Sequence, residues 1–221
     1  MTDTPDLVTI TDPQSPAAEA YRTLRMNLQF VALDSDLQTL LVTSPGPGEG
    51  KTTTLANLAV TMAQIDQRII VVDCDLRKPY VHRFFGLSND VGLTTMMLDD
   101  DALASPPLQD TMVDGLRVLP SGPLPPRPAD LLGSKRMLQV IHALCEQADL
   151  VLFDAPPVMA ATDAAVLATR MDGILLVVSA GDTKREHAAA ALDRLRKINA
   201  NIVGAVLNNA ASEPSLAGYY R

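Results

Sequence analysis

The sequence is poor in several residue types, and each shortage narrows what the chain can be. It contains only two cysteines, Cys74 and Cys145, which is too few for a disulfide framework or a four-thiolate metal site. Tryptophan is absent and aromatic residues make up only 4% of the chain, so the core must consist mainly of aliphatic side chains. No apolar run approaches the roughly 20 residues that a membrane-spanning helix needs. We therefore expect a chain that does not span a membrane.

Basic residues are also scarce. The 18 lysines and arginines stand against 26 aspartates and glutamates, which gives a net charge of −8. This balance argues against a general nucleic-acid-binding protein, and we expect no nucleic-acid partner. A secretory signal, with its charged segment followed by an apolar one, does not open the chain. Together with the low cysteine content, this predicts a cytoplasmic protein.

Glycine and proline are concentrated in one loop. Residues 40–54 read LLVTSPGPGEGKTTT, which predicts an apolar strand, a flexible loop and the start of a helix. Glycines let a backbone approach a polyphosphate closely, and a helix start presents free amides to it. The pattern G-x-x-x-x-G-K-[ST] requires glycine where this chain has Pro45, so the loop is a variant of that pattern. We expect the phosphates of a nucleotide to bind at Gly46, Pro47, Gly48, Glu49, Gly50, Lys51, Thr52 and Thr53.

Two further apolar runs end in carboxylates. Asp73 and Asp75 follow one run, and because side chains alternate along an extended chain, both are expected on the same side. Asp154 follows another run in the form of a Walker B strand. We predict that Lys51 bridges the outer phosphates, that Thr52, Asp75 and Asp154 hold Mg²⁺, and that Asp73 or Asp75 takes the acceptor's proton. No glutamate stands beside Asp154 to activate water, which favours transfer to a hydroxyl over hydrolysis.

The remaining apolar runs alternate with helical patterns. They are continuous, as in strands buried on both faces, which predicts a mostly parallel sheet in a doubly wound α/β fold with its ligand at the carboxyl ends of the strands. A capping-box pattern at Thr183 opens the last helix. Strands are expected at residues 69–72, 116–119, 150–153, 174–178 and 202–207, and helices at residues 16–32, 52–65, 134–147, 162–169 and 183–198.

The two ends of the chain lack apolar periodicity. Residues 1–15 are expected to form an extended, mobile arm, residues 16–209 a single P-loop domain, and residues 210–221 a flexible tail. On the first long helix, apolar residues share one face and charged residues another. We expect the apolar face to pack inward and the charged ladder to remain free.

In their order along the chain, these segments resemble the bacterial tyrosine kinases, cytoplasmic P-loop kinases associated with capsule and exopolysaccharide export. The resemblance covers nearly the whole chain. It implies a P-loop NTPase fold of the deviant-Walker branch, ATP and Mg²⁺ as cofactors, and transfer of the γ-phosphate to protein tyrosines. The segments are EAYRTLR (residues 19–25), PGEGKT (47–52), DCDLRKP (73–79), LPSGPLPP (119–126), LLGSKRM (131–137), DAPP (154–157) and TD (162–163).

The resemblance also implies an assembly. In that family an E-x-x-R-x-x-R ladder joins subunits into a ring, commonly an octamer, which would place Glu19, Arg22 and Arg25 at an interface rather than on a solvated face. Phosphorylated tyrosines often lie in the kinase's own C-terminal tail, and the candidates are Tyr219 and Tyr220, fewer than relatives usually carry. Members without a membrane half depend on a transmembrane activator of the polysaccharide co-polymerase type. Its cytoplasmic tail completes the active site, which implies recruitment to the inner face of the plasma membrane.

Two other functions are compatible with the sequence. A partition or division-site ATPase of the same branch would carry a signature lysine where this chain has Gly46, so that function is disfavoured. A nucleotide-binding scaffold with little kinase activity agrees with the short tyrosine tail. By resemblance to related P-loop proteins, Asn208 at the end of the last expected strand is placed near the adenine base.

Overall fold

The structure, a computed structural model, describes residues 7–33 and 36–211. Its centre is one seven-stranded sheet. The strands are β1 (Thr39–Thr43), β2 (Ile69–Asp73), β3 (Gln109–Asp110), β4 (Leu116–Leu119), β5 (Leu150–Asp154), β6 (Gly173–Ser179) and β7 (Ile202–Asn208). They lie in the order β3-β4-β2-β5-β1-β6-β7, and every pair is parallel except β3 with β4. The predicted parallel sheet is confirmed, and the short antiparallel edge strand β3 was not predicted.

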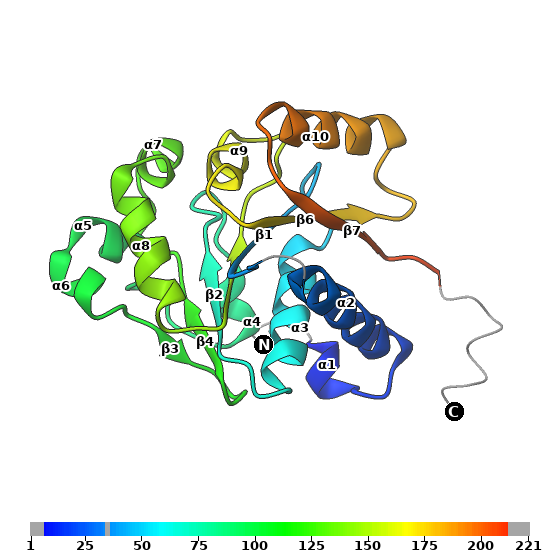
Figure 1. Ribbon diagram of the computed structural model, residues 1–221, viewed down its shortest axis with the longest axis horizontal. Coiled ribbons are helices and arrows are strands. Elements are labelled where there is room, and N and C mark those ends of the chain that lie inside the picture. Colours follow the sequence, from blue (N-terminus) through cyan, green and yellow to red (C-terminus); the bar gives the residue numbers. More distant parts are fainter. Residues whose placement is uncertain (1–6, 34–35, 212–221) are drawn as a thin grey trace.

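Helices cover both faces of this sheet (Figure 1). They are α1 (Val8–Thr11), α2 (Pro16–Leu33), α3 (Lys51–Ala63), α4 (Val81–Phe84), α5 (Leu93–Leu98), α6 (Asp100–Ala104), α7 (Pro128–Leu132), α8 (Lys135–Cys145), α9 (Asp163–Ala168) and α10 (Arg185–Lys197). The first four pack on one face and the remaining six on the other. Within the described ranges, no helix is long and apolar enough to cross a membrane.

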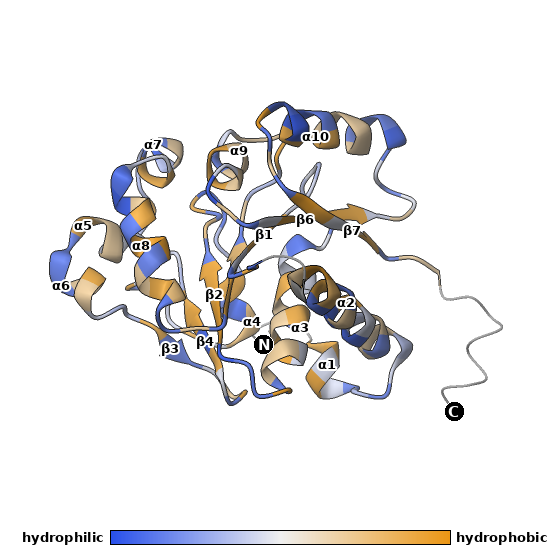
Figure 2. Cartoon of the chain, viewed as in Figure 1, coloured by the Kyte–Doolittle hydropathy of each residue, from blue (hydrophilic) through white to orange (hydrophobic). Residues whose placement is uncertain are grey.

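The continuous apolar runs of the strands follow from this three-layer arrangement. In β1, Leu40 and Val42 belong to the core beneath α3, whereas Leu41 belongs to the core on the opposite face, and all three are fully buried. Successive side chains of a strand point to opposite faces, so a strand covered on both sides needs apolar residues at every position. Figure 2 shows the resulting hydrophobic sheet between helices whose outer surfaces are hydrophilic.

The N-terminal segment differs from the prediction. The backbone N and the Oγ1 of Thr9 both donate to Oδ1 of Asn57 on α3, at 3.1 and 2.9 Å. Leu7 and Thr9 are buried, so α1 docks on α3, and the expectation of an extended, mobile arm is wrong for residues 7–11. The reason is the fully buried Asn57, whose side chain needs polar partners that α1 supplies. Residues 1–6 and the tail from residue 212 lie outside the described residues.

We expected the charged ladder on α2 to remain free, but two of its side chains are held by hydrogen bonds. Arg22 Nη1 donates to Oε2 of Glu19 at 2.8 Å, and Arg25 Nη1 donates to the carbonyl oxygen of Thr61 on α3 at 2.8 Å. Long basic side chains can lie along a neighbouring helix and reach its carbonyl groups, which a helical-wheel argument does not reveal. Inward packing of the apolar face is confirmed by Leu28, which is 4% exposed.

Candidate active site

The glycine-rich loop joins β1 to α3 at the carboxyl edge of the sheet. Gly48 and Gly50 have φ angles of +78° and +84°, a left-handed conformation that glycine adopts without steric cost. At Gly50 a Cβ atom would also lie 2.0 Å from Nδ2 of Asn208, so a larger residue would have to displace that side chain. Gly50 is the N-cap of α3, whose first amides have no acceptor within the helix. The loop therefore presents the amides of a 13-residue helix to an anion.

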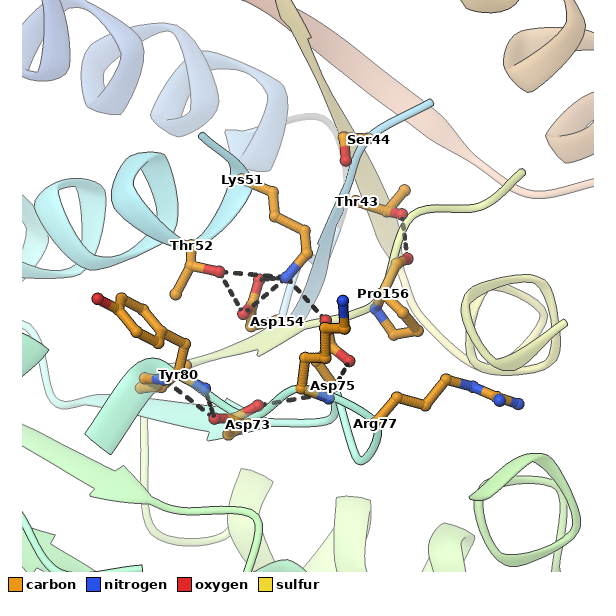
Figure 3. A network of polar contacts seen from close by, with 12 residues as sticks. Thr43, Ser44, Lys51, Thr52, Asp73, Asp75, Arg77, Tyr80, Asp154 and Pro156 are labelled. Atoms are coloured by element: carbon orange, nitrogen blue, oxygen red, sulfur yellow. Dashed lines mark hydrogen bonds and ion pairs between the residues drawn. The ribbon is translucent and has the colours of Figure 1, made fainter. Parts of the chain in front are cut away.

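Lys51, the first residue of α3, lies among carboxylates from two other strand ends (Figure 3). Its Nζ is 3.2 Å from Oδ2 of Asp75 and 3.2 Å from Oδ2 of Asp154. The hydroxyl of Thr52 donates to the same Asp154 oxygen at 2.7 Å. The fold thus brings together side chains that the sequence predicted from three separate segments.

Burial and charge act against each other in this cluster. Burial lowers the pKa of Lys51, but the charges of Asp154 and Asp75 and their hydrogen bonds to Lys51 together outweigh burial, and the pKa is raised above its ordinary value. Burial raises the pKa of Asp154, an effect that the Lys51 charge opposes. Burial, reinforced by the charge of Asp154, raises the pKa of Asp73 to about 8. The ammonium group of Lys51 therefore balances an acidic site that would otherwise repel phosphates.

The two candidate proton acceptors lie in different surroundings. Asp73 is fully buried, and its Oδ2 accepts from the backbone N of Tyr80 at 2.9 Å and of Val81 at 3.0 Å. Its Oδ1 accepts from the backbone N of Asp75 at 3.2 Å. Both oxygens of Asp73 thus hold the turn after β2. Asp75, in contrast, directs Oδ2 toward Nζ of Lys51.

The donor atoms around Thr52 suit a magnesium ion. Thr52, Asp75 and Asp154 offer oxygen atoms only, the ligands that Mg²⁺ prefers. Among the residues that the structure describes, no three acidic, histidine or cysteine side chains converge to hold a metal by themselves. Mg²⁺ usually keeps several waters and shares phosphate oxygens with its substrate. The set therefore fits a magnesium site that a bound nucleotide completes.

Sequence reasoning missed an ion pair beside this cluster. Arg77, in the turn after β2, donates from Nε and Nη2 to the two carboxylate oxygens of Asp163, at 2.8 and 3.0 Å. Asp163 opens α9 and is fully buried, whereas the side chain of Arg77 is 50% exposed. Both residues belong to the segments that carry the family resemblance, but only the fold shows that they meet. The pair ties the turn that carries Asp75 to the segment after β5.

Other predicted residues lie beside the loop or away from it. Nδ2 of Asn208 donates to the carbonyl oxygen of Glu49 at 3.0 Å, so Asn208 adjoins the phosphate loop, and its place near the adenine base stays a prediction. The ladder residues Glu19, Arg22 and Arg25 lie on α2, and the hydrogen bonds described above join them to α2 and α3. The predicted phosphate acceptors Tyr219 and Tyr220 lie outside the described residues.

Comparison with known proteins gives the family. A model of the CobQ/CobB/MinD/ParA nucleotide-binding domain matches residues 40–217. The tyrosine-protein kinase YwqD of Bacillus subtilis (strain 168) is 42% identical over 216 residues, which are 97% of this chain and 91% of that protein. The chain belongs to the bacterial tyrosine kinases. The kinase is also 32% identical to the putative tyrosine-protein kinase CapB of Staphylococcus aureus, over 94% of this chain and 91% of CapB.

Solved structures agree with this assignment. The kinase domain of the Escherichia coli tyrosine kinase ETK superposes on this chain with a TM-score of 0.89 at 33% identity. The match covers 97% of this chain and 84% of the ETK chain. This chain is thus a protein-tyrosine kinase with a nucleotide-binding P-loop domain, as the sequence predicted. The alternative of a partition ATPase is set aside.

Proposed function

We propose that the kinase transfers the γ-phosphate of ATP to tyrosines, with Lys51, Thr52, Asp75 and Asp154 as its working groups. The observation that carries this proposal is their convergence: Nζ of Lys51 lies within hydrogen-bonding reach of Asp75, Asp154 and Thr52 at one edge of the sheet. Catalysis of phosphoryl transfer depends mostly on positioning and on neutralising charge, and this cluster supplies both.

Each group has a role that its surroundings support. The amides at the start of α3 would hold the nucleotide phosphates, and Lys51 would exchange its carboxylate partners for outer phosphate oxygens. Oδ2 of Asp75 would accept the proton of the tyrosine hydroxyl. The tyrosine oxygen would bond to the γ-phosphorus as the bond between that phosphorus and ADP breaks. Asp73 keeps the turn after β2 in place through its backbone hydrogen bonds. Of the three residues that fit magnesium, Thr52 and Asp154 would hold the ion, which would supply positive charge to the phosphates, and Asp75 would be left free to act as the base.

The acceptors that we propose are Tyr219 and Tyr220, phosphorylated in trans within a ring of identical subunits. Fully extended, a dozen residues span about 40 Å, a length compatible with transfer to the tail from the active site of a neighbouring subunit. The proposed ring interface contains the ladder residues Glu19, Arg22 and Arg25, which lie on the surface helix α2.

The partner that we propose is a transmembrane activator of the polysaccharide co-polymerase type, whose cytoplasmic tail completes the site. The kinase would thereby act at the inner face of the plasma membrane and regulate the synthesis and export of capsular polysaccharide or exopolysaccharide. The name of the relative CapB and the solved chimeric protein CapA2B2 support this context, the latter with a TM-score of 0.86 at 33% identity.

A mixing experiment tests transfer in trans. Lys51→Ala, with its tail intact, is incubated with ATP, Mg²⁺ and a second variant in which Tyr219 and Tyr220 are phenylalanine. Mass spectrometry should find phosphate on the tail of Lys51→Ala only when the second variant is present. A tail that stays unmodified in the mixture, while an added tyrosine peptide is phosphorylated, would contradict tail phosphorylation in trans but not the kinase itself.

The same reactions, run with and without the cytoplasmic tail of a candidate activator, test the partner. We expect the activator tail to increase the rate of phosphotyrosine formation. An unchanged rate with activator tails from the organism's own polysaccharide co-polymerases would remove the proposed dependence.

A further inference from the structure

Glu49 is the acidic residue within the phosphate loop, and its side chain is held on all sides. Its Oε1 accepts from the backbone N of Gly46 at 2.7 Å, within the loop itself. Its Oε2 accepts from the hydroxyl of Thr183 at 2.7 Å and from the backbone N of Ser179 at 3.3 Å. Glu49 is 7% exposed, so this carboxylate is almost completely enclosed.

A carboxylate in a phosphate cradle needs an explanation, because it repels the anion that the cradle binds. Here both oxygens of Glu49 are occupied by donors, and the donors to Oε2 come from the end of β6 and the segment that follows it. The Glu49 carboxylate thus faces β6. Its hydrogen bonds link the phosphate loop to the end of β6 and to the segment that follows this strand.

A second hydrogen bond strengthens the same connection. Nδ2 of Asn208, at the end of β7, donates to the carbonyl oxygen of Glu49 at 3.0 Å. The neighbouring Asn209 donates from Nδ2 to the hydroxyl of Ser179 at 2.9 Å. The phosphate loop is therefore fastened through both the backbone and the side chain of Glu49 to the ends of β6 and β7.

This connection lies away from the catalytic cluster. In the sheet, β1 stands between β5 and β6, with β2 beyond β5 and β7 beyond β6. Asp75 and Asp154 approach the loop from the side of β2 and β5, whereas Thr183 and Asn208 approach it from the side of β6 and β7. Thr183 therefore contacts the phosphate loop on the side opposite to the carboxylates of the Lys51 cluster.

We propose that Glu49 and Thr183 are positioning residues for nucleotide binding. Their hydrogen bond holds the phosphate loop in its anion-binding shape and turns the Glu49 carboxylate away from the phosphates. A binding loop that is held in its bound shape loses less conformational entropy when the ligand arrives, which raises affinity. The inference rests on the phosphate loop being the nucleotide site. It also explains why the predicted capping box fails: the N-cap of α10 is Lys184, without a side-chain cap, and the Thr183 hydroxyl serves Glu49 instead.

The test uses Thr183→Val in the full chain, with ADP affinity measured by calorimetry and ATP kinetics on a tyrosine peptide. We expect the ADP Kd and the KM for ATP to rise about tenfold, the size typical of a lost hydrogen bond to a charged group. The kcat at saturating ATP should change by less than about twofold, because the interaction affects ground state and transition state alike. Thr183→Ser keeps the hydroxyl and should restore both constants, a recovery that loss of packing alone would not give.

Two further variants complete the design. Thr169→Val removes an exposed hydroxyl that bonds only within its own helix end, and should leave the ADP Kd unchanged. The double variant with Glu49→Ala and Thr183→Val should bind ADP less than about twofold more weakly than Glu49→Ala alone, since both changes remove the same interaction.

The outcomes separate the inference from its premise. If the unmodified kinase binds no ADP, the loop is not the nucleotide site. If the kinase binds ADP and Thr183→Val binds it equally well, or if Thr183→Ser fails to restore affinity, the positioning role is wrong. Effects of Glu49→Ala and Thr183→Val that multiply in the double variant would also overturn it.

Discussion

Replacing Arg77 with alanine should destabilise the kinase and slow its chemical step, and the structure gives the size of the first effect. The guanidinium group of Arg77 makes a two-point contact with Asp163 at 2.8 and 3.0 Å. Because Asp163 is fully buried, Arg77→Ala leaves a carboxylate without its counter-charge. Breaking a fully buried pair costs about 3–5 kcal/mol, and because half of the Arg77 side chain is in water we expect about 2 kcal/mol.

The relative stabilities of the variants test the reasoning more directly than the size of the stability loss in any one of them. Asp163→Ala removes the buried charge together with its need for a partner, so adding it to Arg77→Ala should recover part of the lost stability. In a chain of this size, a loss of about 2 kcal/mol lowers the Tm by about 4–8 °C. The matched control is Arg127→Ala, whose pair with Asp130 at 3.5 Å is exposed on both sides and should contribute less than about 0.5 kcal/mol.

Chemical denaturation and thermal melting of these variants provide the stabilities, and kinetics on a tyrosine peptide provide the rate. Because Arg77 anchors the turn that carries Asp75, kcat should fall about tenfold in Arg77→Ala, with less change in the KM for ATP. A double variant that is less stable than Arg77→Ala would refute the argument from an unpaired buried charge. An unchanged kcat would show that the ion pair does not position Asp75.

Three further predictions concern the loop, the base and the assembly. Gly50→Ala should weaken ADP binding in calorimetry by about tenfold or more, because the φ of +84° disfavours alanine and the new Cβ, 2.0 Å from Nδ2 of Asn208, would displace that side chain; an unchanged ADP affinity would contradict the described loop geometry. Asp75→Asn should lower kcat about a hundredfold or more, the usual contribution of a general base, and a kcat within about threefold of the unmodified enzyme would exclude Asp75 from that role. Arg22→Ala, which removes the ion pair with Glu19 while sparing the contact between α2 and α3, should lower the assembled mass in sedimentation; an unchanged mass would remove Arg22 from the interface.

The sheet and the cluster of side chains around Lys51 could be predicted because their signals are local. A strand buried on both faces needs a continuous apolar run, and β5 shows such a run ending at Asp154. The glycine-rich loop and the acids at strand ends are short patterns, and a parallel sheet brings strand ends to one edge. Lys51, Asp75 and Asp154 therefore met as expected.

The remaining features depend on contacts between distant segments. Glu49 and Thr183 are 134 residues apart, and Arg77 and Asp163 are 86 apart, so no periodicity within either segment reveals their hydrogen bonds. Thr183 illustrates the difficulty, since a local capping pattern and a distant carboxylate compete for one hydroxyl and the buried carboxylate has the greater need for a donor. The docking of α1 similarly depends on Asn57, a single polar residue in an otherwise apolar part of α3.

The most direct test of the central assignment is phosphotyrosine formation by the unmodified kinase and by Lys51→Ala, each incubated with ATP, Mg²⁺, a tyrosine peptide and the activator tail. The account predicts phosphotyrosine on the peptide with the unmodified kinase. It predicts a loss of about a hundredfold or more with Lys51→Ala, because this variant lacks the positive charge that we propose neutralises the phosphates. Equal phosphotyrosine from both proteins, or none from either, would contradict the assignment of Lys51 and its carboxylate neighbours as the active site.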